Sequence, residues 1–450
     1  MFKKIKSKFK TIPFHMPGHK RNKKFFNTLG NNLLDYDFTE INDLDNLHCA
    51  NGIIDTAQKK CANIFGCERS FFLVNGASCG VLSSICATCC EQDYILALRS
   101  SHISFYNALE ISGAKAVFIY QKKFNGIFYD FNFNKFEDFL NKNKKIKAVF
   151  ITSPNYYGVC LDLTKIAKMT RKYNKILIVD ESHGSHFYFN NFFPDSAIKC
   201  GANIVINSLH KTLPCLTQSA VLNINNLSKF YVGRLEKYLK IFQTSSPSYI
   251  LMSIIDFSIR KIDNNKNLFE RYIKEILKIR KKLNPNKNIK LLEKESYNLI
   301  YDIDISKLTF INYSNYKSKD FIDFFRDNNI ELELISDENF IAITSVCDRK
   351  KNLDKLLNAI NKLEKISNKE NKNNCVRDNV FLKDKSVMSI KSANKQKNKK
   401  VLLKDSINKI CAQYIIKYPP GIPILIPGEI ISHNHINMIQ EHYSEIKILV

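Results

Sequence analysis

Long hydrophobic runs are missing from this sequence. No apolar stretch approaches the roughly 18 residues that a membrane-spanning helix needs. The basic residues 1–10 are followed by no apolar segment of the kind that a secretory signal contains. The pattern therefore predicts a cytoplasmic protein that has no membrane partner.

Acidic residues are few relative to basic ones. The 450 residues include 43 Asp and Glu against 68 Lys and Arg, which gives a formal net charge of +25. Such an excess can indicate a nucleic-acid partner. However, the lysines accompany abundant Asn and Ile, a combination that an A/T-rich coding sequence favours. Neither a basic patch with interleaved aromatic residues nor a nucleic-acid motif is evident, so we expect no nucleic-acid partner.

Metal-ligand spacings are also missing. Cys86, Cys89 and Cys90 form a C-x-x-C-C cluster, but no second C-x-x-C or paired His follows at the spacing that zinc sites use. Cys79, Cys86 and Cys90 recur at helical intervals, as small hydrophobic residues do on a buried helix face. We therefore expect the 13 cysteines to be reduced thiols, and we expect no metal site.

Short apolar runs alternate with longer amphipathic stretches between residues 70 and 225. The candidate strands are 71–74, 94–98, 116–120, 148–151, 176–179 and 204–206, the last of which closes the series. Helical stretches such as 81–90 and 104–112 separate them. Continuous apolar strands separated by helices are typical of a parallel sheet buried on both faces. The predicted fold class is therefore α/β.

The composition divides the chain into four segments. A large domain with an N-terminal segment is expected over residues 1–250, and a smaller α+β domain over 251–364. Residues 365–405 are rich in Lys, Asn and Ser and offer little to bury, which predicts a solvated linker. A short C-terminal domain is expected over 406–450.

Two polar segments follow strands of the predicted sheet. Asp180 comes at the end of the strand 176–179, at the edge where open α/β sheets bind their ligands. It could equally cap a helix. Lys211 follows the strand 204–206, where desolvation can lower the pKa of a lysine and make its amine a nucleophile. On its own, Lys211 could also be an ordinary surface lysine.

Two further segments have the residue types of a phosphate site and of an aromatic contact. Asn75 to Gly80 joins a strand to a helix, and its glycines allow a tight turn with N–H groups that can bind phosphate. It is not a Walker A loop, because no Gly-Lys-Ser/Thr follows. His102 follows the strand 94–98 and could cover an aromatic ligand or simply cap a helix.

The order of these segments resembles that of fold-type-I pyridoxal-phosphate enzymes. Other segments resemble motifs of the Orn/Lys/Arg decarboxylase family: residues 13–20, 37–40, 44–48, 151–159, 180–184, 208–212, 243–249, 418–423 and 427–429. The resemblance covers nearly the whole chain, densely before residue 250. It implies a fold-type-I large domain, and the chain resembles the short form of the family, which lacks an N-terminal wing domain.

The resemblance implies a role for each matching residue. Lys211 would hold the aldehyde of pyridoxal 5′-phosphate as a Schiff base, Asp180 would pair with the ring nitrogen, and His102 would stack on the ring. The other expected cofactor contacts are the side chains of Ser78, His183, Ser208 and His210 and the backbone N–H groups of Ala77 and Cys79. Ala77 and Cys79 stand where the family usually has hydroxyl residues, which removes up to two side-chain donors worth about 1 kcal/mol each.

The resemblance also implies partners. Thr244 and Ser245 would approach the cofactor from the neighbouring subunit of a homodimer, and Glu429 would bind the distal cationic group of the substrate. The expected reaction is decarboxylation of a basic amino acid, with arginine first and lysine or ornithine next, in polyamine biosynthesis. Two alternatives remain: an aminotransferase or aldolase of the same fold, or a catalytically degenerate protein that binds the cofactor.

Overall fold

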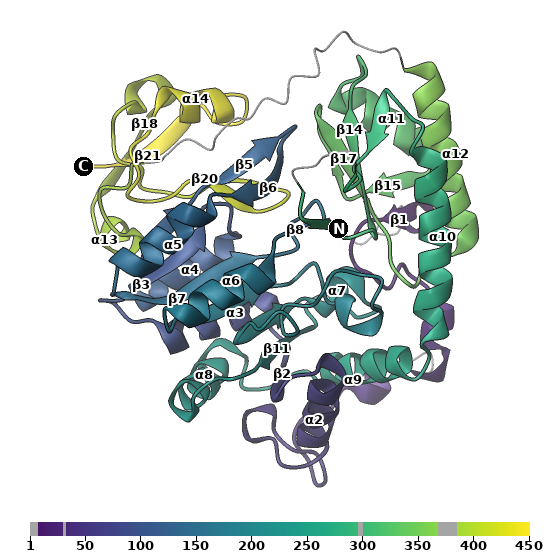
Figure 1. The fold of residues 1–450 in the computed structure, drawn as a ribbon, viewed down its shortest axis with the longest axis horizontal. Helices are drawn as coiled ribbons and strands as arrows, with labels where there is room; N and C mark the ends of the chain where they lie inside the picture. Colours follow the sequence, from purple (N-terminus) through teal and green to yellow (C-terminus); the bar gives the residue numbers. More distant parts are fainter. Residues whose placement is uncertain (1–7, 30–32, 296–299, 368–384) are drawn as a thin grey trace.

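The computed structural model describes residues 8–29, 33–295, 300–367 and 385–450. At the centre of its large domain lies a seven-stranded sheet with the strand order β2-β11-β10-β9-β7-β3-β4 (Figure 1). The strands are β2 (Arg69–Leu73), β3 (Tyr94–Leu98), β4 (Lys115–Ile119), β7 (Ile146–Thr152), β9 (Ile176–Asp180), β10 (Ile204–Asn207) and β11 (Ala220–Ile224). The pairs from β10 to β4 are parallel, and only β11 runs against its neighbours. The predicted α/β fold with a mainly parallel sheet is confirmed.

Hydrophobic clusters cover both faces of this sheet. One cluster includes residues of α3 (Gly76–Thr88), α4 (Ile103–Ser112) and α8 (Lys229–Phe242), and the other includes residues of α5 (Phe133–Lys142) and α6 (Leu163–Lys172). Along β3, Ile95 and Ala97 join the first cluster, while Leu96 and Leu98 join the second. Because successive strand residues point to opposite faces, a sheet buried on both sides needs the unbroken apolar runs seen in the sequence.

One strand of the sheet was absent from the sequence-based prediction. The series does not close at residue 206, because β11 follows and pairs with both β10 and β2. Asn223 interrupts its apolar run, which hides the strand pattern. In the fold this amide is fully buried and satisfied: its Nδ2 donates to Asn207 Oδ1 at 3.0 Å, and its Oδ1 accepts from Ser70.

The small domain is an antiparallel sheet with the order β12-β14-β17-β16, flanked by helices. Its strands are β12 (Ile289–Leu291), β14 (Lys307–Asn312), β16 (Leu334–Ile335) and β17 (Asn339–Ile343), and its helices are α10 (Asn267–Leu283), α11 (Ser318–Asp327) and α12 (Lys350–Ile366). α9 (Tyr249–Asp263) precedes it. The N-terminal strand β1 (Ile12–Phe14) pairs in parallel with β15 (Ile330–Leu332), so this part of the N-terminal segment joins the small domain.

The predicted linker is partly wrong. Residues 368–384 lie outside the described residues, but 385–405 are folded into a C-terminal unit that spans 385–450. Here α13 (Ile390–Asn394) buries Ile390, and β18 (Asn398–Leu402) pairs with β21 (Glu445–Leu449). A few apolar side chains and backbone pairing are enough to order this lysine-rich stretch, whose charged side chains stay exposed. The unit also contains β19 (Ile415–Lys417), β20 (Ile422–Leu425) and α14 (His433–Ile439).

Three further pieces lie beside the large sheet. α2 (Ile53–Phe65) precedes β2, β5 (Gln121–Phe124) pairs with β6 (Ile127–Phe131), and β8 (Val159–Cys160) pairs with β13 (Asp302–Ile303). The β8–β13 pair links the large domain directly to the chain that leads into β14.

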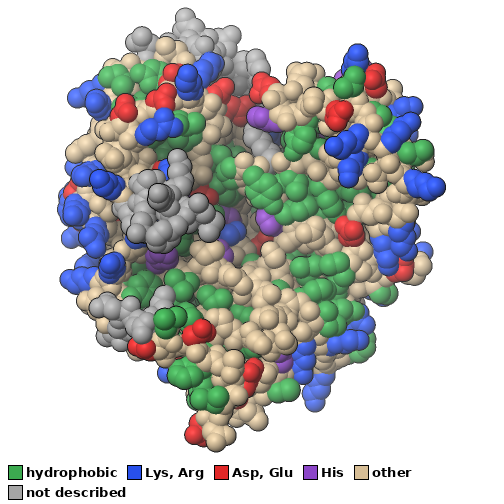
Figure 2. All heavy atoms as spheres, turned by 180° about the vertical axis from the view of Figure 1, so that it is seen from behind, with side chains coloured by type: hydrophobic (Ala, Val, Ile, Leu, Met, Phe, Trp, Pro, Cys, Tyr) green, Lys and Arg blue, Asp and Glu red, His purple; other side chains and the backbone are tan. Residues whose placement is uncertain are grey.

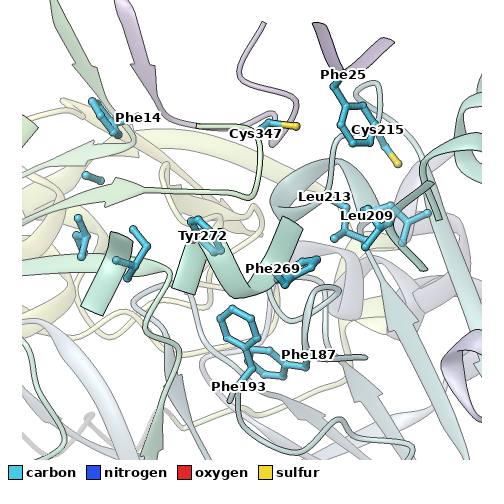
Figure 3. Packing of buried hydrophobic residues seen from close by; sticks show 14 of the residues in the cluster. Phe14, Phe25, Phe187, Phe193, Leu209, Leu213, Cys215, Phe269, Tyr272 and Cys347 are labelled. Carbon is cyan, nitrogen blue, oxygen red and sulfur yellow. The ribbon is translucent and has the colours of Figure 1, made fainter. Parts of the chain in front are cut away.

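A short helix, α7 (Leu209–Thr212), follows β10 and is anchored in a large buried cluster. In Figure 3, Leu209 and Leu213 lie in the cluster that also holds Phe25 and Phe269. Gly18 approaches the same turn so closely that a Cβ atom there would lie 2.6 Å from Leu213 O. The backbone on either side of position 211 is therefore held by packing.

Among the described residues, none of the helices has the length and hydropathy to cross a membrane, and no cluster of His, Cys, Asp and Glu could hold a metal ion. Lys and Arg are spread over the visible face in Figure 2 rather than gathered in one patch. The predicted buried helix face of cysteines is right for Cys79 and Cys86, which are buried in α3, but wrong for Cys90, which is exposed because the helix ends at Thr88.

Candidate active site

A cavity of about 440 Å³ lies at the carboxyl ends of β7, β9 and β10. Glu333 of the small domain and residues 418–420 of the C-terminal unit complete its wall, so all three parts of the chain contribute. Eight of the predicted site residues line it: Ala77, Ser78, His102, Asp180, His183, Ser208, His210 and Lys211. The fold thus brings together polar segments that are up to 134 residues apart in the chain (77 to 211).

Lys211 projects from α7 into this cavity. Its Nζ lies 3.1 Å from Nε2 of His183. Burial lowers the pKa of the Lys211 amine, and the carboxylates of Asp180 and Glu333 oppose that shift. A desolvated amine with a lowered pKa is the form in which a lysine attacks an aldehyde.

Asp180 is the last residue of β9 and is almost completely buried. Its Oδ1 accepts a hydrogen bond from the backbone N–H of Ser182 at 3.1 Å. Thr152 lies beside it in register on β7, and its buried hydroxyl has no hydrogen-bond partner in the part of the chain that the structure describes. Buried polar atoms normally have a hydrogen-bond partner, so the unpaired hydroxyl indicates a wall at which a polar ligand could bind.

The amino end of α3 is suited to bind an anion such as a phosphate group. Gly76 opens this 13-residue helix with φ of +75°, and no side chain caps its first N–H groups. Ala77 and Ser78 line the cavity there, and Ser208 and His210 line it from the other side. Uncapped N–H groups at a helix amino end favour an anion, which offsets the missing hydroxyl donors noted in the sequence.

Cys79 is not one of the side chains in the cavity. Its thiol donates to Gly76 O at 3.0 Å and packs in the cluster between α3 and the sheet. Burial raises the pKa of this thiol to about 12, so it is unreactive. The predicted cofactor contact of Cys79 is through its backbone N–H, so the position of the thiol leaves that prediction unchanged.

His102 has the capping role that the sequence allowed, and its position leaves the other role, covering an aromatic ligand, open. It is the N-cap of α4, where its Nδ1 accepts from the backbone N–H of Ser104 at 3.2 Å, and it also lines the cavity. Burial and the neighbouring Lys211 lower the pKa of the imidazole to about 4, against the pull of Asp180. The ring is therefore neutral at pH 7, and capping holds it in place.

Glu429 does not fit its predicted role as a substrate ligand. Its side chain is fully buried outside the cavity, where the carboxylate pairs with Arg99 Nη2 at 3.0 Å and accepts from the backbone N–H of Ile426. Because this carboxylate is buried outside the cavity and its charge is already balanced by Arg99, it cannot contact a substrate cation in the cavity. The motif around Glu429 was recognisable in the sequence, but its partner Arg99, which follows β3, could not be predicted from the motif.

Thr244 and Ser245 are exposed and lie outside the cavity of their own chain. The backbone N–H of Thr244 donates to Asn75 Oδ1 at 3.4 Å, which places this loop beside the start of α3. Their predicted contact from a neighbouring subunit stays a prediction.

Three residues at the site were missed as site residues by the sequence analysis. Glu333 lines the cavity from a stretch with no recognisable motif. Lys307, at the start of β14, places its Nζ 2.8 Å from Nδ1 of His183. Tyr156 donates its phenolic O–H to Glu333 Oε1 at 2.8 Å and belongs to the motif 151–159, which was the one available signal.

The site combines four features at one edge of a mainly parallel sheet: a buried lysine, a carboxylate at the neighbouring strand end, an imidazole that caps a helix, and a helix amino end suited to an anion. This combination defines the class of fold-type-I pyridoxal-phosphate enzymes. The residues fit the cofactor: Lys211 would be the amine for its aldehyde, Asp180 would pair with its ring nitrogen, and the start of α3 would bind its phosphate. When bound, the cofactor supplies an electron sink for the breaking bond. Asp180 can hold the proton that makes the ring a stronger sink.

Comparisons with known proteins agree with this class. Residues 2–344 match the Orn/Lys/Arg decarboxylase major domain, and residues 372–444 match the C-terminal domain of the same family. The chain belongs to the Orn/Lys/Arg decarboxylase family. It is a pyridoxal-phosphate-dependent amino-acid decarboxylase.

Similar individual proteins cover most of the chain. The arginine decarboxylase of Bacillus subtilis is 30% identical over 443 residues, which are 95% of this chain and 90% of that one. The arginine decarboxylase of Halalkalibacterium halodurans is 30% identical over 97% of this chain and 91% of its own. The constitutive lysine decarboxylase of E. coli shares the fold with a TM-score of 0.78 at 15% identity, over 97% of this chain and 79% of its own.

Proposed function

We propose that this decarboxylase acts on a basic amino acid, with arginine as the first candidate and lysine or ornithine next. The observation that carries the proposal is the carboxylate of Glu333 in the same cavity as Lys211. Its two oxygens each accept one hydrogen bond, from Tyr156 and from the backbone N–H of Met16 at 2.9 Å. A carboxylate has about four acceptor sites, so capacity remains for a guanidinium or ammonium group.

Similarity to relatives named arginine decarboxylases supports arginine as the first candidate. Arginine would give its amine, agmatine, and CO₂, a product class that belongs to polyamine biosynthesis. The likeness to a lysine decarboxylase at 15% identity bears on the fold alone and does not rank the substrates.

The test is a direct assay of products. Purified protein with pyridoxal phosphate is incubated separately with arginine, lysine and ornithine, and amine, CO₂ and keto acid are measured. The expected result is amine and CO₂ in equal amounts, with the highest kcat/KM for arginine. Formation of a keto acid would instead favour an aminotransferase. K211A is the control. If this variant and the wild type behave alike, a catalytically degenerate protein that binds the cofactor is the better interpretation.

We also propose a homodimer whose active sites take residues from both subunits. The support is the exposed position of Thr244 and Ser245 beside α3, together with large exposed apolar side chains at Phe38 and Ile53. Light scattering should give twice the mass of the chain, and a monomeric mass would refute the dimer. In mixing experiments, K211A and a T244A/S245A variant should together regain about a quarter of wild-type activity, because half of the dimers are mixed and each carries one intact site.

A further inference from the structure

Gly421, in the turn between β19 and β20 of the C-terminal unit, lies against the edge of the His102 ring. It is buried, and its φ of +83° is in the left-handed region. A Cβ atom at this position would lie 2.9 Å from Cδ2 and 3.0 Å from Nε2 of His102, and 2.9 Å from Cε1 of Tyr418. Both the backbone conformation and the close approach therefore require a residue without a Cβ atom.

A backbone hydrogen bond joins the same turn to the start of α4. The carbonyl of Gly421 accepts from the backbone N–H of Ile103 at 3.0 Å. Ile103 is the first residue of α4, and the first N–H groups of a helix have no partner within it. The C-terminal unit thus supplies one cap of the helix whose side-chain cap is His102.

Arg99 holds the residues that follow this turn. Its Nη1 donates to Pro423 O at 2.8 Å, and its Nη2 donates to Ile424 O at 3.2 Å and pairs with Glu429. Residues 99–103 therefore meet the C-terminal unit at a guanidinium, at an imidazole ring and at the first N–H of a helix. Because the arginine is almost completely buried, the turn is held in place on both sides of Gly421.

The other edge of the His102 ring is held by its own helix. Nδ1 accepts from the backbone N–H of Ser104 at 3.2 Å and lies 2.9 Å from Oγ of the same residue. Nδ1 and Cδ2 flank one ring carbon, so one edge is hydrogen-bonded while the other packs against Gly421. Turning the ring over would place a carbon against the N–H of Ser104 and break the cap. A Cβ atom at position 421 must therefore displace either the turn or the capped ring.

We propose that Gly421 is a positioning residue for the decarboxylase: it lets the C-terminal unit close against His102 and fixes the imidazole in the cavity wall. Residues 418–420 and Ile422, on either side of Gly421, line the same cavity. The turn thus shapes the wall and holds the ring at the same time. The proposal rests on the contact of the two residues and not on the identity of the substrate.

A double-mutant cycle on the full-length protein without cofactor tests this contact. G421A adds the Cβ atom, and H102S removes the ring while keeping a good N-cap. Backbone strain and the collision with Tyr418 are present in both backgrounds, whereas the collision with the imidazole is lost in H102S. We expect G421A to lower Tm by about 2 °C more in the wild-type background than in the H102S background. An equal fall in both backgrounds would overturn the proposal.

A second variant covers the case in which G421A does not fold. Asparagine adopts the left-handed conformation more readily than alanine, so G421N adds the same Cβ atom with less backbone strain. It should show the same dependence on the ring of His102. Stability of G421N equal to that of the wild type in the presence of the ring would contradict the close contact.

G66A is the matched control. Gly66 also has a left-handed backbone, with φ of +64°, but a Cβ atom there would have no atom within 4 Å. G66A therefore carries backbone strain without a collision, and its fall in Tm should be the same with and without H102S. Coupling to H102S as large as that of G421A would show a general effect of destabilisation and would also overturn the proposal.

Cofactor binding separates a positioning role from a merely structural contact. Pyridoxal phosphate is titrated into each variant, and the bound fraction is followed by visible absorbance. G421A should weaken binding about tenfold in the wild-type background and less than about twofold in H102S. Coupling in Tm without coupling in Kd would make the contact structural only and refute the positioning role. Neither measurement uses an amino-acid substrate, so a failure here is distinguishable from a wrong substrate in the product assay.

Discussion

Arg99 and Glu429 form a buried ion pair that joins the large domain to the C-terminal unit. Arg99 Nη2 and Glu429 Oε2 are 3.0 Å apart, and each side chain is 1% exposed. Arg99 also donates to Pro423 O at 2.8 Å and to the Tyr106 hydroxyl at 3.0 Å. The pair therefore fixes the chain on either side of β20, whose neighbouring residues 418–420 form part of the cavity wall.

Replacing Glu429 should mainly affect stability. E429Q leaves the Arg99 guanidinium buried without its counter-charge, which costs about 3–5 kcal/mol. Thermal unfolding of the two proteins measures the loss. Below the unfolding temperature, KM for the amino acid should stay within about twofold of wild type. A large rise in KM at unchanged stability would instead return Glu429 to the role of substrate ligand. R99M/E429M, which removes both charges, should recover part of the stability.

Replacing Glu333 should mainly affect substrate binding. E333Q keeps the shape of the side chain but removes the charge that would meet a cationic group. A hydrogen bond to a charged group contributes about 1.5–3 kcal/mol, so KM for the basic amino acid should rise about 10- to 150-fold. Steady-state kinetics checks this. Y156F removes one neutral donor from the carboxylate and should change KM much less, whereas equal effects of the two variants would count against a charge contact.

Asparagine at position 102 should separate the two roles of His102. Asn is a good N-cap, so H102N should lose little of the stability that H102A loses, about 1 kcal/mol. Asn has no aromatic ring to cover a flat cofactor, so both variants should lose activity and bind cofactor more weakly. Thermal unfolding of the two variants, together with the visible absorbance of their bound cofactor, gives the comparison. Wild-type cofactor spectra in H102N would show that capping is the whole role of this residue.

Glu181 should make stability depend on pH. Burial raises the pKa of its carboxyl group from 4.5 to about 7, against hydrogen bonds from Tyr188, Asn207 and Ala197. Between those pH values the folded state binds more protons than the unfolded state, so this group loses its stabilising contribution as pH rises. E181Q does not titrate. Its stability relative to wild type should therefore increase from pH 5 to pH 8, by up to about 3 kcal/mol. A difference that is constant with pH would contradict the raised pKa.

The parts of the site that local pattern predicted are those that follow strands. Asp180 comes directly after an apolar run, and Lys211 lies in the short helix that follows the next strand. Because parallel strands end at one edge of a sheet, sequence order is enough to bring the two residues together. Glu333 and Lys307 come from the antiparallel small domain, where no such rule relates a strand end to the edge of another sheet. Their positions depend on how the two domains pack, through contacts such as the β8–β13 pair.

In the C-terminal unit, the tertiary structure changed two predictions that were based on local sequence. The motif around Glu429 was visible in the sequence and led to a role in substrate binding, yet the fold places Arg99 against it. The lysine-rich stretch 385–405 was expected to be solvated because it has few apolar residues, yet it finds a backbone partner in β21. In both cases a partner hundreds or tens of residues away decided the outcome.

By itself, the sequence determined the alternation of strands and helices, the order of the segments expected to bind the cofactor, and the place of Lys211 after a strand. These features are local, because side-chain period and strand-end position are properties of short segments. Only the tertiary structure decided which carboxylate lies in the cavity, which one neutralises a buried arginine, and that Lys307 and Lys211 contact the two ring nitrogens of His183. Charge and proton position depend on burial and on neighbours from other elements, and these exist only once the domains are packed together.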